Sequence, residues 1–316
     1  MAMFIKILQF YGRFMLSFTG IGYWWRRLFV WGRFRPDFTG QTWVVTGASG
    51  GLGRAIVTGA ARAGAKVIAM ARDESKLRAL AAEAPPGSVT TITADFSSKA
   101  DTARATRLLL DRVAAAGGAV DVLVNNVGVL LDHCEITPEG HEKSFVTNIL
   151  SHFILTEGLL AQKAVKPGGV IVNMSSGGMY NAPLLVSAMD VTTPQKYNGV
   201  RAYAIHKRGQ AALTEYWRER EAALGLNVYV MHPGWADTQG VKTSLPRFRR
   251  ILQLILRNAE QGADTALWLA ATKPVNPVPD AFWFDRATRD AHAYPFTKVS
   301  KFRKEDLVKY LEGVRG

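Results

Sequence analysis

Residues 42–53 read TWVVTGASGGLG, and this stretch decides the fold. A short apolar, β-branched run enters a glycine-rich turn, and GRAIVTGAARAG then continues with helical spacing. In that context the backbone N–H groups at the start of the helix can bind a pyrophosphate, and glycines let the chain approach it closely. Gly47, Gly51 and Gly53 therefore predict a dinucleotide site. The alternative is a tight strand–helix turn without a ligand.

Similar strand-like runs recur along the chain between helical stretches. The runs starting at residues 66, 89, 120, 168 and 225 are KVIAMAR, VTTITADFS, VDVLVNNVG, GGVIVNMSS and GLNVYVMHPG. Such apolar runs are typical of strands buried on both faces of a parallel sheet. The alternation predicts an α/β fold with a doubly wound parallel sheet, the Rossmann fold. We expect this domain over residues 39–275, between an N-terminal arm (1–38) and a C-terminal extension (276–316) that ends in a short amphipathic helix.

The residues after the second predicted strand indicate which cofactor binds. An acidic residue there holds the ribose hydroxyl of NAD, whereas an arginine accommodates the 2′-phosphate of NADP. Here Arg72 comes first and Asp73 follows, while Arg54 adds a second cation beside the glycine motif. The order favours NADP over NAD. The alternative is that Arg72 is solvated and Asp73 binds the ribose.

A second pair of residues suggests chemistry. Tyr203 and Lys207 lie four apart in RAYAIHKRGQ (201–210), so they share one face of a helix. An ammonium beside a phenol lowers the phenol's pKa, which suits a general acid or base. On these two residues alone, a surface tyrosine beside a solvated lysine is the more common explanation of the spacing, so the rest of the chain has to decide.

Several motifs together resemble the classical type of the short-chain dehydrogenase/reductase superfamily. They extend over most of residues 40–240 and occur in the same order as in that family. NNVG at 125–128 is similar to its Asn-Asn-Ala-Gly signature, with Val127 in place of alanine. The resemblance implies cofactor contacts from Gly47, Ser49, Gly51, Leu52, Gly53, Arg72, Asp95, Asn125, Tyr203, Lys207, Pro233 and Gly234. It also implies a catalytic set of Asn148, Ser176, Tyr203 and Lys207.

By this resemblance, hydride passes between NADP(H) and an apolar carbonyl or alcohol. Tyr203 would exchange the proton, and Lys207 would hold the nicotinamide ribose and lower the pKa of Tyr203. Ser176 would bind the substrate oxygen, and Asn148 would anchor a water that passes protons to Lys207. The alternative function is a membrane-associated nucleotide-binding scaffold with little or no turnover. The complete catalytic set favours the enzyme.

The later motifs resemble one branch more narrowly. SSGGM, HPGWADT, EQGADTALWLA and FWFDR are similar to the branch called dehydrogenase/reductase SDR family member 12. Between Ser176 and Tyr203 the chain is longer than in classical members, and LLVSAMDVTTPQKYNGVR (184–201) resembles the insertion of retinol-dehydrogenase-like members. We therefore expect the usual catalytic set with a differently shaped substrate pocket.

Composition narrows the partners. A single cysteine, Cys134, excludes an intrachain disulfide and fits an intracellular protein. The six histidines have no paired ligand spacing, and the adjacent residues Asp132–Glu135 cannot all face one ion, so we expect no metal. The net charge is +13, and no acidic residue precedes Asp37, so basic charge gathers in the arm. Because the basic charge gathers in this aromatic arm, we expect no nucleic-acid partner.

The arm combines cations with aromatic rings. Its longest uncharged run, residues 14–25, is shorter than the roughly 20 residues of a membrane-spanning helix. Arginine and aromatic residues together suit the headgroup boundary, so we expect residues 1–35 to lie peripherally on an anionic membrane. The alternatives are packing on the protein's own sheet edge or on a second subunit of a homo-oligomer, and a mitochondrial targeting peptide. The segment 244–258 would cover the substrate, lie on the membrane, or pack as an ordinary amphipathic helix.

Overall fold

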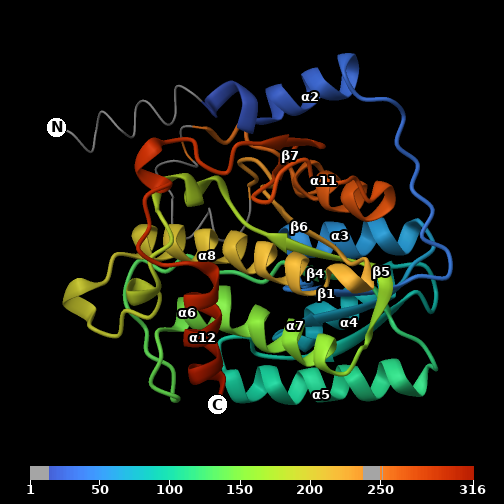
Figure 1. The fold of residues 1–316 in the computed structure, drawn as a ribbon. Helices are drawn as coiled ribbons and strands as arrows, with labels where there is room; N and C mark the ends of the chain where they lie inside the picture. The colour runs from blue at the N-terminus through green and yellow to red at the C-terminus, as the bar shows by residue number, and fades with distance from the viewer. Residues whose placement is uncertain (1–13, 238–249, 251) are drawn as a thin grey trace.

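The computed structural model describes residues 14–237, 250 and 252–316, and these build an eight-stranded sheet (Figure 1). The strand order is β3-β2-β1-β4-β5-β6-β7-β8. All neighbours run parallel except β8, which pairs antiparallel with β7. The strands are β1 (Thr42–Thr46), β2 (Lys66–Ala71), β3 (Val89–Thr93), β4 (Val120–Asn125), β5 (Val165–Met174), β6 (Asn227–Met231), β7 (Phe282–Phe284) and β8 (Ala287–Arg289). The predicted doubly wound sheet is confirmed.

Helices cover both faces of the sheet. One face carries α3 (Gly51–Arg62), α4 (Glu74–Glu83) and α11 (Ala259–Thr272), and the other carries α5 (Lys99–Ala115), α7 (Ser151–Ala161), α8 (Gly199–Arg220) and α12 (Lys304–Arg315). Figure 1 shows α3 and α11 on one side of the strands and α5 and α12 on the other. Each face has its own apolar core, so the strands are buried on both sides as their composition predicts. The predicted C-terminal amphipathic helix is α12.

The hairpin of β7 and β8 was not predicted from the sequence. Each strand has three residues, too few to show a period. The two-residue turn between them, Asp285 and Arg286, has φ values of +51° and +56°. Such a turn normally uses Asn-Gly or Asp-Gly, so Asp-Arg carries no clear hairpin signal. Ion pairs hold both residues in this conformation, Asp285 with Arg257 and Arg286 with Asp264.

The arm is partly built into the fold. Its helix α2 (Gly20–Phe29) lies over β7 (Figure 1), and Phe18 and Tyr23 are buried. Phe18 packs edge-on against Phe284 of β7 at 4.8 Å between ring centroids. The alternative that the arm packs on the protein's own sheet therefore describes one side of the arm. Its first 13 residues lie outside the described part of the chain.

One buried arginine fastens the arm to the rest of the protein. Arg257 donates to both carboxylate oxygens of Asp285, at 2.5 and 2.7 Å, and to the carbonyl oxygens of Ser17 and Phe18, each at 3.0 Å. Arg26 of α2 donates to the same carboxylate at 2.8 Å. Arg257 and Asp285 are each about 1% exposed, so neither charge has water as an alternative partner.

We predict that Asp285→Ala lowers the free energy of unfolding by about 3–5 kcal/mol, because it leaves a buried arginine without its counter-ion. Urea unfolding followed by tryptophan fluorescence measures this change. Glu305→Ala is the control, since Glu305 forms a loose surface pair with Arg303 at 3.8 Å and such pairs contribute about 0–1 kcal/mol. A loss for Asp285→Ala no larger than for the control contradicts the anchoring role.

Candidate active site

The glycine loop joins β1 to α3. It is held by Asn126, which follows β4, a strand that neighbours β1 in the sheet. Asn126 donates through Nδ2 to the carbonyl oxygen of Thr46 at 2.8 Å, and the Thr46 hydroxyl accepts from the Asn126 backbone at 3.0 Å. Gly47 and Gly51 have φ values of +66° and +51°, and a Cβ on Gly53 would collide with the Gly47 carbonyl. Only glycine fits these positions without strain.

The start of α3 suits an anion. Its N-cap residue is Gly50, and no side chain caps the first turn. The free N–H groups there point outward from a positive helix end, which is the chemistry that binds phosphate. Ser49 and Leu52, two further predicted contacts, lie half-buried in this loop and first turn. The residues present therefore fit the pyrophosphate of a dinucleotide.

Arg72 and Asp73, which both follow β2, have different surroundings. Arg72 is exposed, whereas the Asp73 carboxylate caps α4 by accepting from the Lys76 backbone at 3.0 Å and from the Ser75 hydroxyl at 2.7 Å. These hydrogen bonds hold the pKa of Asp73 well below its usual range. Arg54, expected as a second cation for the cofactor, forms an ion pair with Glu83 instead.

Asp95, just after β3, and Asn125, at the end of β4, lie in different surroundings. Asp95 is half-buried and accepts from the backbone and hydroxyl of Ser97 at 2.9 and 2.8 Å. Asn125 is fully buried and donates to Asn173 of β5 at 2.9 Å and to Thr156 of α7 at 3.0 Å. Asn125 therefore ties strands and helix together, and its neighbour Asn126 contacts the glycine loop.

Three predicted catalytic residues meet where β5 ends. Tyr203 and Lys207 lie on α8, and Ser176 begins the turn η2 (Gly177–Asn181). Lys207 Nζ donates to the carbonyl oxygen of Met174 at 2.7 Å and lies 5.4 Å from the centre of the Tyr203 ring. The geometry thus brings the phenol, the serine and the ammonium to the carboxyl edge of the sheet, near the glycine loop that follows β1.

The protonation of this group differs from the expectation. Burial raises the pKa of Tyr203, and a hydrogen bond with Ser176 only partly offsets that shift. Burial also lowers the pKa of Lys207 to about 7. The predicted lowering of the Tyr203 pKa by Lys207 is wrong, because burial raises this pKa and Nζ is turned to backbone and amide oxygens and not to the phenol.

Asn148 lies in a π-helical turn, η1 (Val146–Leu150), between α6 (Lys143–Phe145) and α7. Its side chain clamps Val129, accepting from the backbone N–H at 2.7 Å and donating to the carbonyl at 2.8 Å. Turns of this kind occur often at functional sites, because they redirect one peptide group. Here the freed carbonyl of Asn148 accepts from Gln210 at 2.8 Å, a contact that the sequence did not suggest.

Pro233 and Gly234 follow β6 and lie beside the turn η2. His232, just before them, accepts through Nδ1 from the backbone N–H of Gly177 at 3.1 Å. Burial and the nearby Arg257 hold the pKa of His232 well below its usual value, so the ring stays neutral. Phe18 of the arm packs on this ring at 4.4 Å. The arm thus touches both loops that flank the site, which no motif indicated.

The insertion between Ser176 and Tyr203 is anchored to the segment after β4 and to α8. Asp190 accepts from the Glu142 backbone at 2.8 Å and contacts His141 at 2.7 Å, and His206 contacts the Met189 carbonyl at 2.7 Å. No metal-binding group of histidine, cysteine and carboxylate side chains occurs among the described residues. Of the segment 244–258, residues 244–249 and 251 lie outside the described part of the chain.

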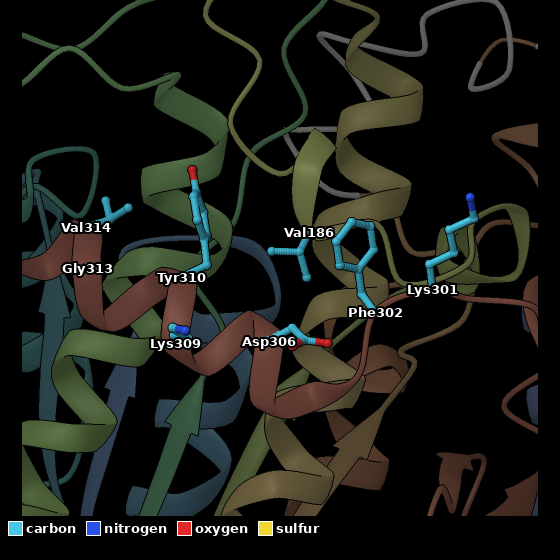
Figure 2. Close-up of a pocket in the computed structure, with 8 residues that line it drawn as sticks. All are labelled: Val186, Lys301, Phe302, Asp306, Lys309, Tyr310, Gly313 and Val314. Atoms are coloured by element: carbon cyan, nitrogen blue, oxygen red, sulfur yellow. The ribbon is translucent and has the colours of Figure 1, made fainter.

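A hollow of about 700 Å³ lies elsewhere, beside α12 (Figure 2). Figure 2 shows Val186 of the insertion, Phe302 just before α12 and Tyr310 of α12 around it. None of the predicted site residues lines it. The hollow is therefore separate from the group around Lys207.

Comparison with known proteins identifies the family. The sequence profile described as short chain dehydrogenase matches residues 41–247. Dehydrogenase/reductase SDR family member 12 of Bos taurus is 32% identical over 296 residues, 86% of this chain and 86% of that protein. Retinol dehydrogenase 12 of Bos taurus is 28% identical, over 82% of this chain and 83% of that protein. The crystal structure of an uncharacterized protein from Mycobacterium Paratuberculosis is 25% identical, with a TM-score of 0.69 over 89% of this chain and 95% of that chain.

These matches cover the glycine loop, the Tyr203–Lys207 pair and most of the sheet. The predicted resemblance, including the likeness to family member 12, is confirmed. The chain belongs to the short-chain dehydrogenase/reductase family, oxidoreductases that act on CH–OH or C=O groups with a nicotinamide cofactor.

Proposed function

We propose that the protein is an NADP(H)-dependent oxidoreductase that transfers hydride between the nicotinamide and an apolar carbonyl or alcohol. The observation that carries this proposal is the meeting of Ser176, Tyr203 and Lys207 at the carboxyl edge of the sheet, beside the glycine loop. Ligands of doubly wound sheets bind at that edge. A scaffold without turnover has no need for a phenol, a serine and a buried ammonium together.

The bound cofactor supplies or accepts the hydride, and the chain's residues handle the proton and the charge. Tyr203 gives its phenolic proton to the carbonyl oxygen on reduction and takes it back on oxidation. Ser176 donates a hydrogen bond to the same oxygen as negative charge develops. Lys207, whose Nζ is held by the Met174 carbonyl and Gln210, would bind the ribose hydroxyls of the cofactor. Asn148 holds the Val129 backbone beside this group.

An apolar substrate is supported by the surroundings of the site. Met179 and Tyr180 of η2 pack in an apolar cluster with Phe18 and Phe282, and the arm adds Phe14, which stacks on Tyr180 at 5.5 Å between ring centroids. Met179 and Tyr180 are buried in this cluster. A relative at 28% identity is named a retinol dehydrogenase, and retinol is an apolar alcohol.

We predict that Tyr203→Phe reduces turnover at least roughly a hundredfold, the usual contribution of a general acid. NADPH binding stays close to that of the native protein, because only the phenolic hydroxyl is lost. Loss of NADPH absorbance with a panel of hydrophobic ketones, quinones and retinoid-like aldehydes measures turnover, and fluorescence titration measures binding. Near-native turnover of this variant removes Tyr203 from the mechanism. Lys207→Ala reduces both binding and turnover.

The cofactor preference rests on Arg72, which is exposed while Asp73 is engaged as a helix cap. We predict that Arg72→Ala weakens NADPH binding by roughly ten- to a hundredfold, the loss of one charge-assisted hydrogen bond, and leaves NADH binding unchanged. Arg62→Ala is the matched control, since Arg62 is exposed at the other end of α3. Equal affinity of the native protein for NADPH and NADH contradicts this assignment.

We also propose that the arm lies on an anionic membrane surface. Trp25, Leu28 and Phe29 of α2 are 63%, 68% and 70% exposed, and the exposed Arg27 and Arg33 accompany them. Aromatic rings with arginines suit the headgroup region. One helix of the described part, Lys143–Ala161, is long and apolar enough to cross a bilayer, but 89% of that stretch is buried in the core.

We predict that the protein floats with phosphatidylserine-containing vesicles at low salt and not with phosphatidylcholine vesicles. Trp25→Ala combined with Phe29→Ala abolishes flotation, because the two rings pack together at 4.6 Å on the exposed face. Val275→Ala combined with Val299→Ala is the control, since these residues are exposed outside the arm. If the native protein stays in the soluble fraction with anionic vesicles, the membrane proposal fails.

A further inference from the structure

Gln210 lies three residues after Lys207 on α8, and its side chain is buried. Its Oε1 accepts from Lys207 Nζ at 3.2 Å, and its Nε2 donates to the Asn148 carbonyl at 2.8 Å. We propose that Gln210 is a positioning residue that orients the Lys207 ammonium toward the nicotinamide ribose. The proposal rests on the function proposed above and adds a residue to it.

The orientation of the Gln210 amide follows from its partners. His152 Nε2 lies 2.8 Å from the Val127 carbonyl, which can only accept, so Nε2 carries the ring proton. Burial lowers the pKa of His152 to about 3, so the ring is neutral and its Nδ1 accepts. Gln210 Nε2 lies 3.1 Å from that Nδ1 and must donate to it. The amide oxygen is thereby turned to Lys207.

This arrangement fixes the lysine. Nζ carries three protons, of which the Met174 carbonyl takes one and Gln210 Oε1 another. No described residue forms a hydrogen bond with the third. Two fixed hydrogen bonds leave the third N–H a single direction, which prepares it for a ligand oxygen.

The same contact sets the charge of Lys207. The titratable groups that face Lys207 are Tyr203 and His206 on α8 and His152 on α7. Burial is the cause of its lowered pKa of about 7, and within the described part of the chain no carboxylate offsets it. Near neutral pH the ammonium therefore depends on the oxygens of Met174 and Gln210. A change of the acceptor at position 210 must change the proton affinity of Lys207.

The test is the pH dependence of NADPH binding, with the substitutions Gln210→Glu and Gln210→Leu. NADPH binding weakens as pH rises through the pKa of Lys207, because the ammonium is lost. A carboxylate at position 210 stabilises the ammonium, so the pH at which NADPH binding weakens rises by roughly one to three units. Leucine removes the hydrogen-bond acceptor, so NADPH binding weakens at a lower pH and turnover falls roughly tenfold or more. Fluorescence titrations of NADPH and reduction of 9,10-phenanthrenequinone provide the two readouts.

Controls separate positioning from packing. Leu109→Ala opens the buried core on α5, which carries none of the site residues, and so lowers stability without changing the pH dependence of NADPH binding. Gln210→Asn keeps the amide and restores part of the native turnover. NADPH titrations repeated in the Tyr203→Phe variant still report the pKa of Lys207. A failure of the proposed role of Tyr203 is therefore distinguishable from a failure of the proposed role of Gln210. If Gln210→Leu does not fold, Gln210→Glu decides alone. If the folded variants keep the native pH dependence of NADPH binding and the native turnover, the proposal is overturned.

Discussion

The buried ion pair of Arg257 and Asp285 connects parts of the molecule that are far apart in sequence. Removing a charge from water is costly, so each of the two side chains requires the other. Arg257 also binds the carbonyls of Ser17 and Phe18, and Gly234 lies so close that a side chain there would collide with it. The pair therefore fixes the arm, the loop after β6 and the β7–β8 turn together. The loops beside Ser176 and Pro233 take their shape from this constraint.

The site itself uses dipoles where many proteins use opposite charges. Lys207 is buried without a carboxylate among its described neighbours, and carbonyl and amide oxygens hold its protons. Such acceptors stabilise an ammonium less than an ion pair does, which leaves the pKa of Lys207 close to neutrality. A lysine in this state responds strongly to a new charge nearby. The positive ring of an oxidised nicotinamide and a phenolate on Tyr203 would act on it in opposite directions.

Sequence alone predicted the features that depend on local rules. The six long strands follow from β-branched runs, the glycine loop from Gly47, Gly51 and Gly53, and the Tyr203–Lys207 pair from helical spacing. It did not predict contacts made by residues with several ordinary uses. Gln210 and Arg257 resemble any polar residues of a helix or loop until the fold brings their partners to them. The direction of the Tyr203 shift was missed because burial, which raises the pKa, is invisible in a spacing.

The arm has a consequence for how the chain is made. Arg26 binds Asp285, a residue 259 positions later in the chain. At translation rates of about 5–20 residues per second, the arm leaves the ribosome roughly 13–50 s before its partner exists. Throughout that interval Phe18 and Tyr23 have no docking surface and stay exposed with the other aromatic rings. A nascent chain of this composition is a natural client for a chaperone or for early contact with a lipid surface.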